Sequence, residues 1–283
     1  MSETNLQPLL PDLDVKACCS LLYESEWARL LLGETFHPGG LALTDRIGQL
    51  LELDGSSHVL DVACGHGAPA IHLAMASGCD LTGIDLSAKN IRLAQEASSA
   101  IGAGDRVRFL QADAEALPFD SNRFDAVICE CALCTFPNKP RAIREIVRVL
   151  KWGGRFGMSD VVREGALPEQ LDHVLAMAAC IADAKSVKDY CTLLNAAGLD
   201  AELVERHDSA LRTIANQIHT RLIGAQLLIR TGAINLPEFD TTQTRTLLGE
   251  ARRAIAGGRL GYGIILASKG RSASHLDAVK TPS

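Results

Sequence analysis

The chain has 283 residues, of which 47% are hydrophobic and 22% charged, enough apolar material for one large α/β domain or two small ones. Aromatic residues make up only 4% and the formal net charge is −6 without a basic run, so nucleic acid is a poor partner. The first residues lack a secretory signal, and no window holds the roughly 18 apolar residues of a membrane helix, so we expect a cytoplasmic protein with no membrane contact.

Residues 1–52 are expected to form a helical N-terminal segment on the substrate side. Apolar residues recur at helical spacing over 14–32, the stretch 36–40 (Phe-His-Pro-Gly-Gly) interrupts them, and a helix resumes over 41–51. Residues 53–166 then alternate between strand and helix patterns, which predicts a mostly parallel sheet with helices on both faces. The strands are expected at 59–63, 80–86, 107–113, 123–130 and 155–162, with helices reaching Met75, spanning Ser87 to about Ala100, and spanning Arg141–Leu150 before Gly153-Gly154.

The remaining chain completes this sheet. Residues 167–200 indicate a helical insertion of two helices, the second opened by the capping pair Ser186 and Asp189. Over 201–270 we expect strands at 201–208 and 262–270, which bring the sheet to seven strands, and helices at 210–231 and 241–256. The tail 271–283 is expected to be disordered.

A glycine-rich loop, residues 61–67, follows the first strand. Small residues at the carboxyl end of a parallel strand let a ligand approach the backbone. Residues 65–70 also satisfy the dinucleotide pattern G-x-G-x-x-G/A, so NAD is an alternative ligand. Asp61 argues against NAD, because its carboxylate repels a pyrophosphate but suits the ammonium of a methionine moiety.

Two more carboxylates end the next two strands. Asp85 is placed to accept hydrogen bonds from both ribose hydroxyls, and Asp113 from the adenine amino group. Either residue alone also fits a turn or a cap. Three acids at three consecutive strand ends, together with the loop, favour a cofactor site.

This ensemble resembles the class I S-adenosylmethionine-dependent methyltransferases over residues 57–163. The resemblance implies a Rossmann-like α/β fold with a mostly parallel seven-stranded sheet that ends in an antiparallel hairpin, and S-adenosylmethionine as cofactor. The family usually has glycine at position 63, a departure that alanine tolerates if its φ is negative. The implied cofactor contacts are Asp61, Ala63, Cys64, Gly65, Gly67, Asp85, Leu86, Asp113, Ala114 and Cys129.

The nine cysteines are unlikely to form a disulfide framework in a reducing compartment. Cys64, Cys79 and Cys191 are expected to be packing residues. The others fall in the three places that face the methyl group in this fold: the N-terminal segment, the end of the fourth strand and the helical insertion. Three thiolates brought together there would hold a soft, thiophilic centre such as trivalent arsenic, whose lone pair is a nucleophile.

Three segments resemble the arsenite S-adenosylmethionine methyltransferases: Asp14-Val-Lys-Ala-Cys-Cys19, Phe124 to Cys131, and Ala179-Cys-Ile-Ala-Asp-Ala184. The resemblance implies one arsenic ligand from each segment, namely Cys18, Cys131 and Cys180, with Cys19 and Cys134 as further candidates. It also implies a metalloid substrate and a thiol reductant such as glutathione or thioredoxin. The chain departs from that family where Glu130 replaces Asn and Cys129 replaces Ser, and residues 36–40 have no counterpart there.

Two other functions stay open. One is a small-molecule O-, N- or C-methyltransferase acting on a quinone, phenol or amine, in which the cysteines are incidental and His207 or His219 would be candidate bases. The other is a non-catalytic metalloid-binding protein, against which the intact acids at the cofactor site argue. His66, in the glycine-rich loop, is expected to help position the cofactor.

Overall fold

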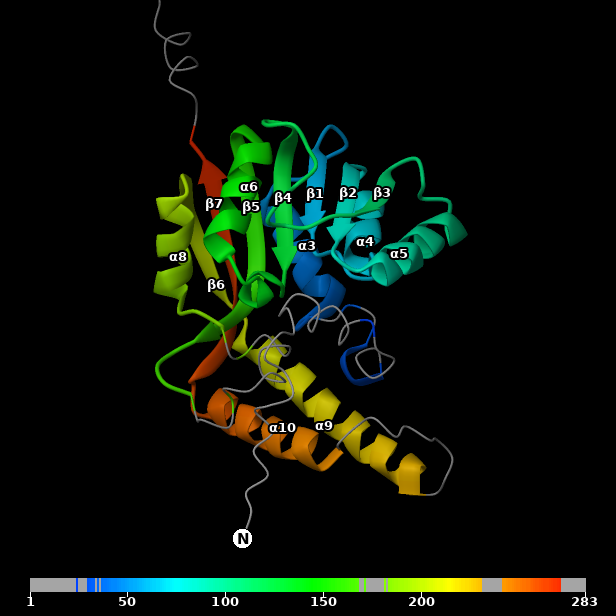
Figure 1. The fold of residues 1–283 in the computed structure, drawn as a ribbon, viewed down its shortest axis with the longest axis vertical. Coiled ribbons are helices and arrows are strands. Elements are labelled where there is room, and N and C mark those ends of the chain that lie inside the picture. Colours follow the sequence, from blue (N-terminus) through cyan, green and yellow to red (C-terminus); the bar gives the residue numbers. More distant parts are fainter. Residues whose placement is uncertain are drawn as a thin grey trace, which may run out of the picture.

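A seven-stranded sheet with the order β3-β2-β1-β4-β5-β7-β6 organises the chain (Figure 1). The structure is a computed structural model that describes residues 24, 30–33, 35, 37–167, 171, 181, 183–230 and 241–270. All neighbouring strands are parallel except β7, which runs antiparallel to both β5 and β6. The strands are β1 (His58–Val62), β2 (Asp80–Asp85), β3 (Val107–Gln111), β4 (Phe124–Glu130), β5 (Leu150–Arg163), β6 (Leu199–Arg206) and β7 (Leu260–Lys269).

Helices cover both faces of the sheet because successive strand residues point to opposite sides. One face packs against α3 (Gly40–Leu50), α4 (Ala68–Ser77) and α5 (Ala88–Ala100), around buried residues such as Ile47, Val59 and Ile128. The other face packs against α6 (Lys139–Val149) and α8 (Val187–Ala196), around Val127 and Ile146.

The two longest helices lie past one edge of the sheet. α9 (Asp208–Arg230) follows β6, and α10 (Thr241–Ala256) packs against it (Figure 1). Since β6 runs in the same direction as β5, α9 leaves the sheet at the edge where the parallel strands end. Ligands of open α/β sheets bind at this carboxyl edge. None of the helices in the described ranges combines the length and apolar character needed to cross a membrane.

The predicted fold class is confirmed, including the antiparallel hairpin that ends the sheet. One local expectation is wrong. Gly153-Gly154 does not stop the helix; α6 already ends at Val149, and Leu150 turns extended to begin β5. The two glycines lie inside β5, where the pairing with β4 shifts between Leu150 and Arg155.

Candidate cofactor and substrate site

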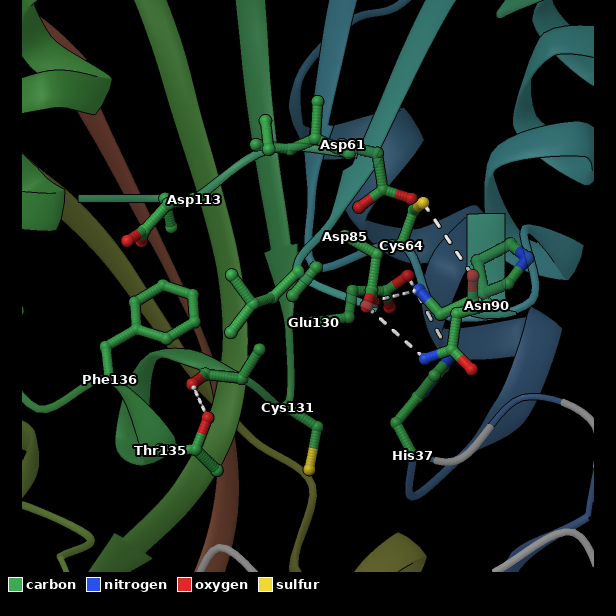
Figure 2. A pocket seen from close by; sticks show the side chains of 18 of the residues that line it. His37, Asp61, Cys64, Asp85, Asn90, Asp113, Glu130, Cys131, Thr135 and Phe136 are labelled. Carbon is green, nitrogen blue, oxygen red and sulfur yellow. Dashed lines mark hydrogen bonds and ion pairs between the residues drawn. The ribbon is translucent and has the colours of Figure 1, made fainter. Parts of the chain in front are cut away.

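A cavity opens at the carboxyl edge of the sheet, between the ends of β1, β2 and β4 (Figure 2). Its empty space, including the solvent at its open mouth, is about 1110 Å³. Its lining is strongly acidic: among the described residues it includes five carboxylates, Asp61, Asp85, Asp113, Glu115 and Glu130.

The loop between β1 and α4 forms the floor of the cavity. Its backbone is held by a bond from the Cys64 amide to the Ile84 carbonyl on β2, 2.9 Å long. Gly67 has a φ of 79°, and a Cβ there would lie 2.6 Å from the ring of Phe109, so only glycine fits. Ala63 does not meet the condition of a negative φ: its φ is 64°, in the left-handed region that glycine usually occupies.

The acid at the end of β2 is fixed by three donors. The Asp85 carboxylate accepts from the amides of Ser87 at 2.8 Å and Gly65 at 3.0 Å, and from the Asn90 side chain at 3.3 Å. Asp85 therefore stabilises the turn that follows β2, one of the two roles expected from the sequence, and it also lines the cavity. Asp113 likewise accepts from the Glu115 amide at 2.9 Å while lining the cavity.

Asp61, at the end of β1, is almost fully buried. Burial raises the pKa of its carboxyl well above the usual range, and the nearby charges of Glu130 and Asp85 raise it further. An ammonium group brought into this cavity reverses that effect, because a cation stabilises the ionised carboxyl. The site is therefore suited to the methionine end of the expected cofactor.

Glu130, the last residue of β4, forms a cluster with Thr44 and His37. The Thr44 hydroxyl donates to both carboxylate oxygens of Glu130, at 3.0 and 3.2 Å. His37 Nε2 lies 3.8 Å from the nearer of them. Burial raises the pKa of Glu130 to about 7 and lowers that of His37 to about 4, so the imidazole is neutral near neutral pH.

The cysteines at the end of β4 differ in their surroundings. Cys131 lines the cavity, is half-buried and has a φ of 53° (Figure 2). Cys129 and Cys134 are buried and are not among the described cavity residues. Burial raises the pKa of the Cys129 thiol well above its usual range. All cysteines in the described ranges are free thiols, and no three His, Cys, Asp or Glu side chains within those ranges converge as a metal site.

Most of the predicted cofactor residues meet at the cavity. Gly67 supports the loop without lining it, and Cys129 packs on the opposite face of the sheet. Cys18, Cys19 and Cys180 lie outside the described residues. The described cavity residues among the predicted set are Asp61, Ala63, Cys64, Gly65, Leu86, Asp85, Asp113, Ala114 and Cys131, with His66 beside them.

The cluster of His37, Thr44 and Glu130 was not predicted from the sequence. Two signals pointed to it: an acidic residue at the end of an apolar strand, and the Phe-His-Pro-Gly-Gly stretch at 36–40 that the family resemblance left without a counterpart. The 86-residue separation of Thr44 and Glu130 in the sequence hid their contact.

Comparisons with known proteins find related sequences and structures. The methyltransferase-domain family matches residues 53–198. The chain is 31% identical over 230 residues to the 27-O-demethylrifamycin SV methyltransferase of Amycolatopsis mediterranei, covering 80% of this chain and 82% of that protein.

Two solved structures share the fold. The [4+2]-cyclase SpnF has a TM-score of 0.70 at 24% identity, covering 89% of this chain and 96% of the cyclase. A phosphoethanolamine N-methyltransferase of Haemonchus contortus, in complex with phosphomonomethylethanolamine and S-adenosylhomocysteine, has a TM-score of 0.76 at 19% identity, covering 92% of this chain and 61% of that chain.

Proposed function

The chain belongs to the class I S-adenosylmethionine-dependent methyltransferases, and we propose that its acceptor is a trivalent arsenical bound by cysteine thiolates. The observation that carries this proposal is Cys131, a thiol that lines the cavity next to the acids of the cofactor site. S-adenosylmethionine, the cofactor of this family, supplies a methyl group on a positively charged sulfur.

The backbone at Cys131 supports a role at the acceptor. Its amide donates to the Ser159 carbonyl on β5 over 2.7 Å, which fixes the left-handed turn that follows β4. A residue with a Cβ in this conformation is strained by roughly 1–2 kcal/mol, and such strain often marks a functional position. Thiolate is also the ligand type that soft, thiophilic centres prefer.

Different residues of the chain bind the cofactor and the arsenic acceptor. Asp61, Asp85 and Asp113 hold the cofactor, and Cys131, with Cys18 and Cys180 of the family resemblance, presents arsenic with its lone pair free. Methylation forms an As–C bond as a C–S bond breaks, and it oxidises arsenic formally to the pentavalent state. A thiol reductant such as glutathione or thioredoxin returns two electrons, and a reducing cytoplasm suits these steps.

Glu130 favours a second candidate, methylation of a small organic hydroxyl or amine. A carboxylate that titrates near neutrality inside a cavity is suited to accept a proton from such an acceptor. The matched relative named for 27-O-demethylrifamycin SV supports an organic acceptor. In this case the cysteines are incidental, and replacing Cys131 leaves turnover nearly intact.

Arsenic speciation by chromatography with elemental mass detection tests the proposal. The purified protein is incubated with arsenite or methylarsenite, S-adenosylmethionine and excess glutathione. We expect methylated arsenic from the wild type and a loss of at least 100-fold in Cys131→Ser. Cys191→Ser is the matched control, because Cys191 is half-buried on α8 and does not line the described cavity.

Three results would contradict the arsenical proposal. Absence of methylated arsenic from a protein that binds S-adenosylmethionine moves the acceptor to an organic compound. Equal turnover in Cys131→Ser and wild type makes the thiol incidental. Tight binding of arsenite without methylated product identifies a metalloid-binding protein.

A further inference from the structure

Three of the acidic side chains in the cavity share one face of the sheet. Asp61 pairs with Gly83 on β2 and Ile128 on β4, so Asp85 and Glu130 each lie two residues beyond a partner of Asp61. A spacing of two residues keeps a side chain on the same face, and it moves the position by roughly 7 Å along the strand. Glu130 therefore lies on the same side of the cavity as Asp61, one pleat further along the strand direction and next to Cys131.

The negative charge of Glu130 has little compensation in the protein itself. Thr44 supplies a single hydroxyl proton, which it shares between the two carboxylate oxygens. His37 is the only basic side chain in the described ranges that comes within ion-pair distance of this carboxylate. Burial lowers the pKa of His37 to about 4, so the ring is neutral near neutral pH. Its Nδ1 donates to the Pro38 carbonyl over 3.2 Å, which leaves the lone pair on Nε2.

We propose that Glu130, on the cavity wall two residues beyond the β4 partner of Asp61, is the counter-ion of the cofactor's sulfonium group and loses that cationic partner once S-adenosylhomocysteine has formed. The two forms of the cofactor have the same adenosine and amino-acid groups and differ by the methyl group and the positive charge it places on sulfur. Glu130 gives the protein a means of preferring the charged form. The proton that returns to Glu130 comes from solvent or from the acceptor, so the inference does not depend on the acceptor's identity.

The pH dependence follows from the burial of Glu130. Its pKa is about 7 in the protein alone, and a cation nearby lowers it. Below pH 7, binding of S-adenosylmethionine must expel a proton, so its affinity falls as the pH falls. Binding of the neutral thioether needs no such release. The preference for S-adenosylmethionine therefore rises by about ten-fold between pH 6 and pH 8 and is level above pH 8.

Other charged groups near Glu130 act on both forms of the cofactor alike. Asp61 and Asp85 face the amino-acid and ribose groups that the two forms share. Asp160, on β5, is held by the amides of Cys134 at 2.8 Å and Val161 at 2.8 Å in either case. Their direct effects on affinity cancel in the ratio of the two dissociation constants, and the repulsion between the charges of Asp61 and Glu130 is removed in Glu130→Gln.

The other titratable neighbours of Glu130 either change protonation outside the range from pH 6 to pH 8 or are tested by substitution. Burial places the pKa of His37 at about 4 and holds those of Cys129 on β4 and Tyr262 on β7 well above their usual ranges. Cys131, next to Glu130, is tested by substitution. Cys131→Ser should keep the pH-dependent preference.

Isothermal titration calorimetry of the full chain tests the proposal without turnover. Dissociation constants for S-adenosylmethionine and S-adenosylhomocysteine are measured from pH 6 to pH 8, in pairs of buffers with different ionisation enthalpies. At pH 7 we expect S-adenosylmethionine to release about half a proton more than S-adenosylhomocysteine does. Glu130→Gln should make the preference independent of pH and lower than the preference that the wild type shows at pH 6.

Thr44→Val gives a second, conservative variant of similar shape. The lost hydroxyl raises the pKa of Glu130, so the midpoint of the preference should move to higher pH. Unchanged affinity for S-adenosylhomocysteine shows that either variant is folded. Equal proton release for the two ligands at pH 7, or a pH-dependent preference that survives in Glu130→Gln, overturns the assignment.

Discussion

The left-handed backbone at Ala63 predicts that replacing this alanine with glycine does not destabilise the protein, although such a substitution usually does. Ala63 has a φ of 64°, which costs a residue with a Cβ roughly 1–2 kcal/mol. Glycine removes that strain, but it adds about 0.4–1 kcal/mol of conformational freedom to the unfolded chain. We therefore expect Ala63→Gly to leave the free energy of unfolding unchanged or to raise it by up to about 1 kcal/mol.

Ala97 provides the matched control. It is exposed near the C-terminal end of α5, and glycine costs up to about 1 kcal/mol relative to alanine within a helix. Urea denaturation should place Ala63→Gly above Ala97→Gly by about 1–2 kcal/mol, at equal dependence on urea concentration. Equal losses in the two variants would refute the argument that Ala63 is strained.

Two further substitutions probe the floor and the wall of the cavity. In Gly67→Ala, the new Cβ would lie 2.6 Å from the Phe109 ring at a φ of 79°. We therefore expect the free energy of unfolding, measured by urea denaturation, to fall by about 2–4 kcal/mol. A fall of less than about 1 kcal/mol would contradict the close packing. The pKa of Glu130 rises from 4.5 to about 7 on folding, so its contribution to stability is full below pH 4.5 and falls by about 3 kcal/mol as the pH rises to 7. Glu130→Gln should therefore gain stability relative to wild type between pH 5 and pH 8, and a pH-independent difference between the two proteins would contradict the buried, ionised carboxylate.

The fold was predictable because each element carries its own signal. The apolar strands near Val59 and Val127 alternate with amphipathic helices, and that pattern specifies a parallel sheet covered on both faces. Ser186 and Asp189 marked the start of α8 because the cap is a local interaction: the Asp189 amide donates to the Ser186 hydroxyl over 3.1 Å. The start of β5 was expected at residue 155, after the glycines at 153–154, whereas its pairing with β4 begins before them, at Leu150.

The site was predictable only where its residues follow strands. Asp61, Asp85 and Asp113 were found because the carboxyl ends of parallel strands meet at one edge. The contact between Thr44 and Glu130 joins distant segments, and no local pattern encodes it. The sign of φ at Ala63 was also beyond the sequence, because the surrounding loop imposes the left-handed conformation and the residue type alone argues against it.

Arsenic K-edge X-ray absorption of the protein with bound arsenite most directly tests the central claim, that cysteine thiolates hold the acceptor at this cavity. We expect three sulfur neighbours in the wild type, from Cys18, Cys131 and Cys180, and two in Cys131→Ser, with Cys191→Ser unchanged. An arsenic atom with the same number of sulfur neighbours in Cys131→Ser as in the wild type, or with oxygen neighbours alone, would contradict it.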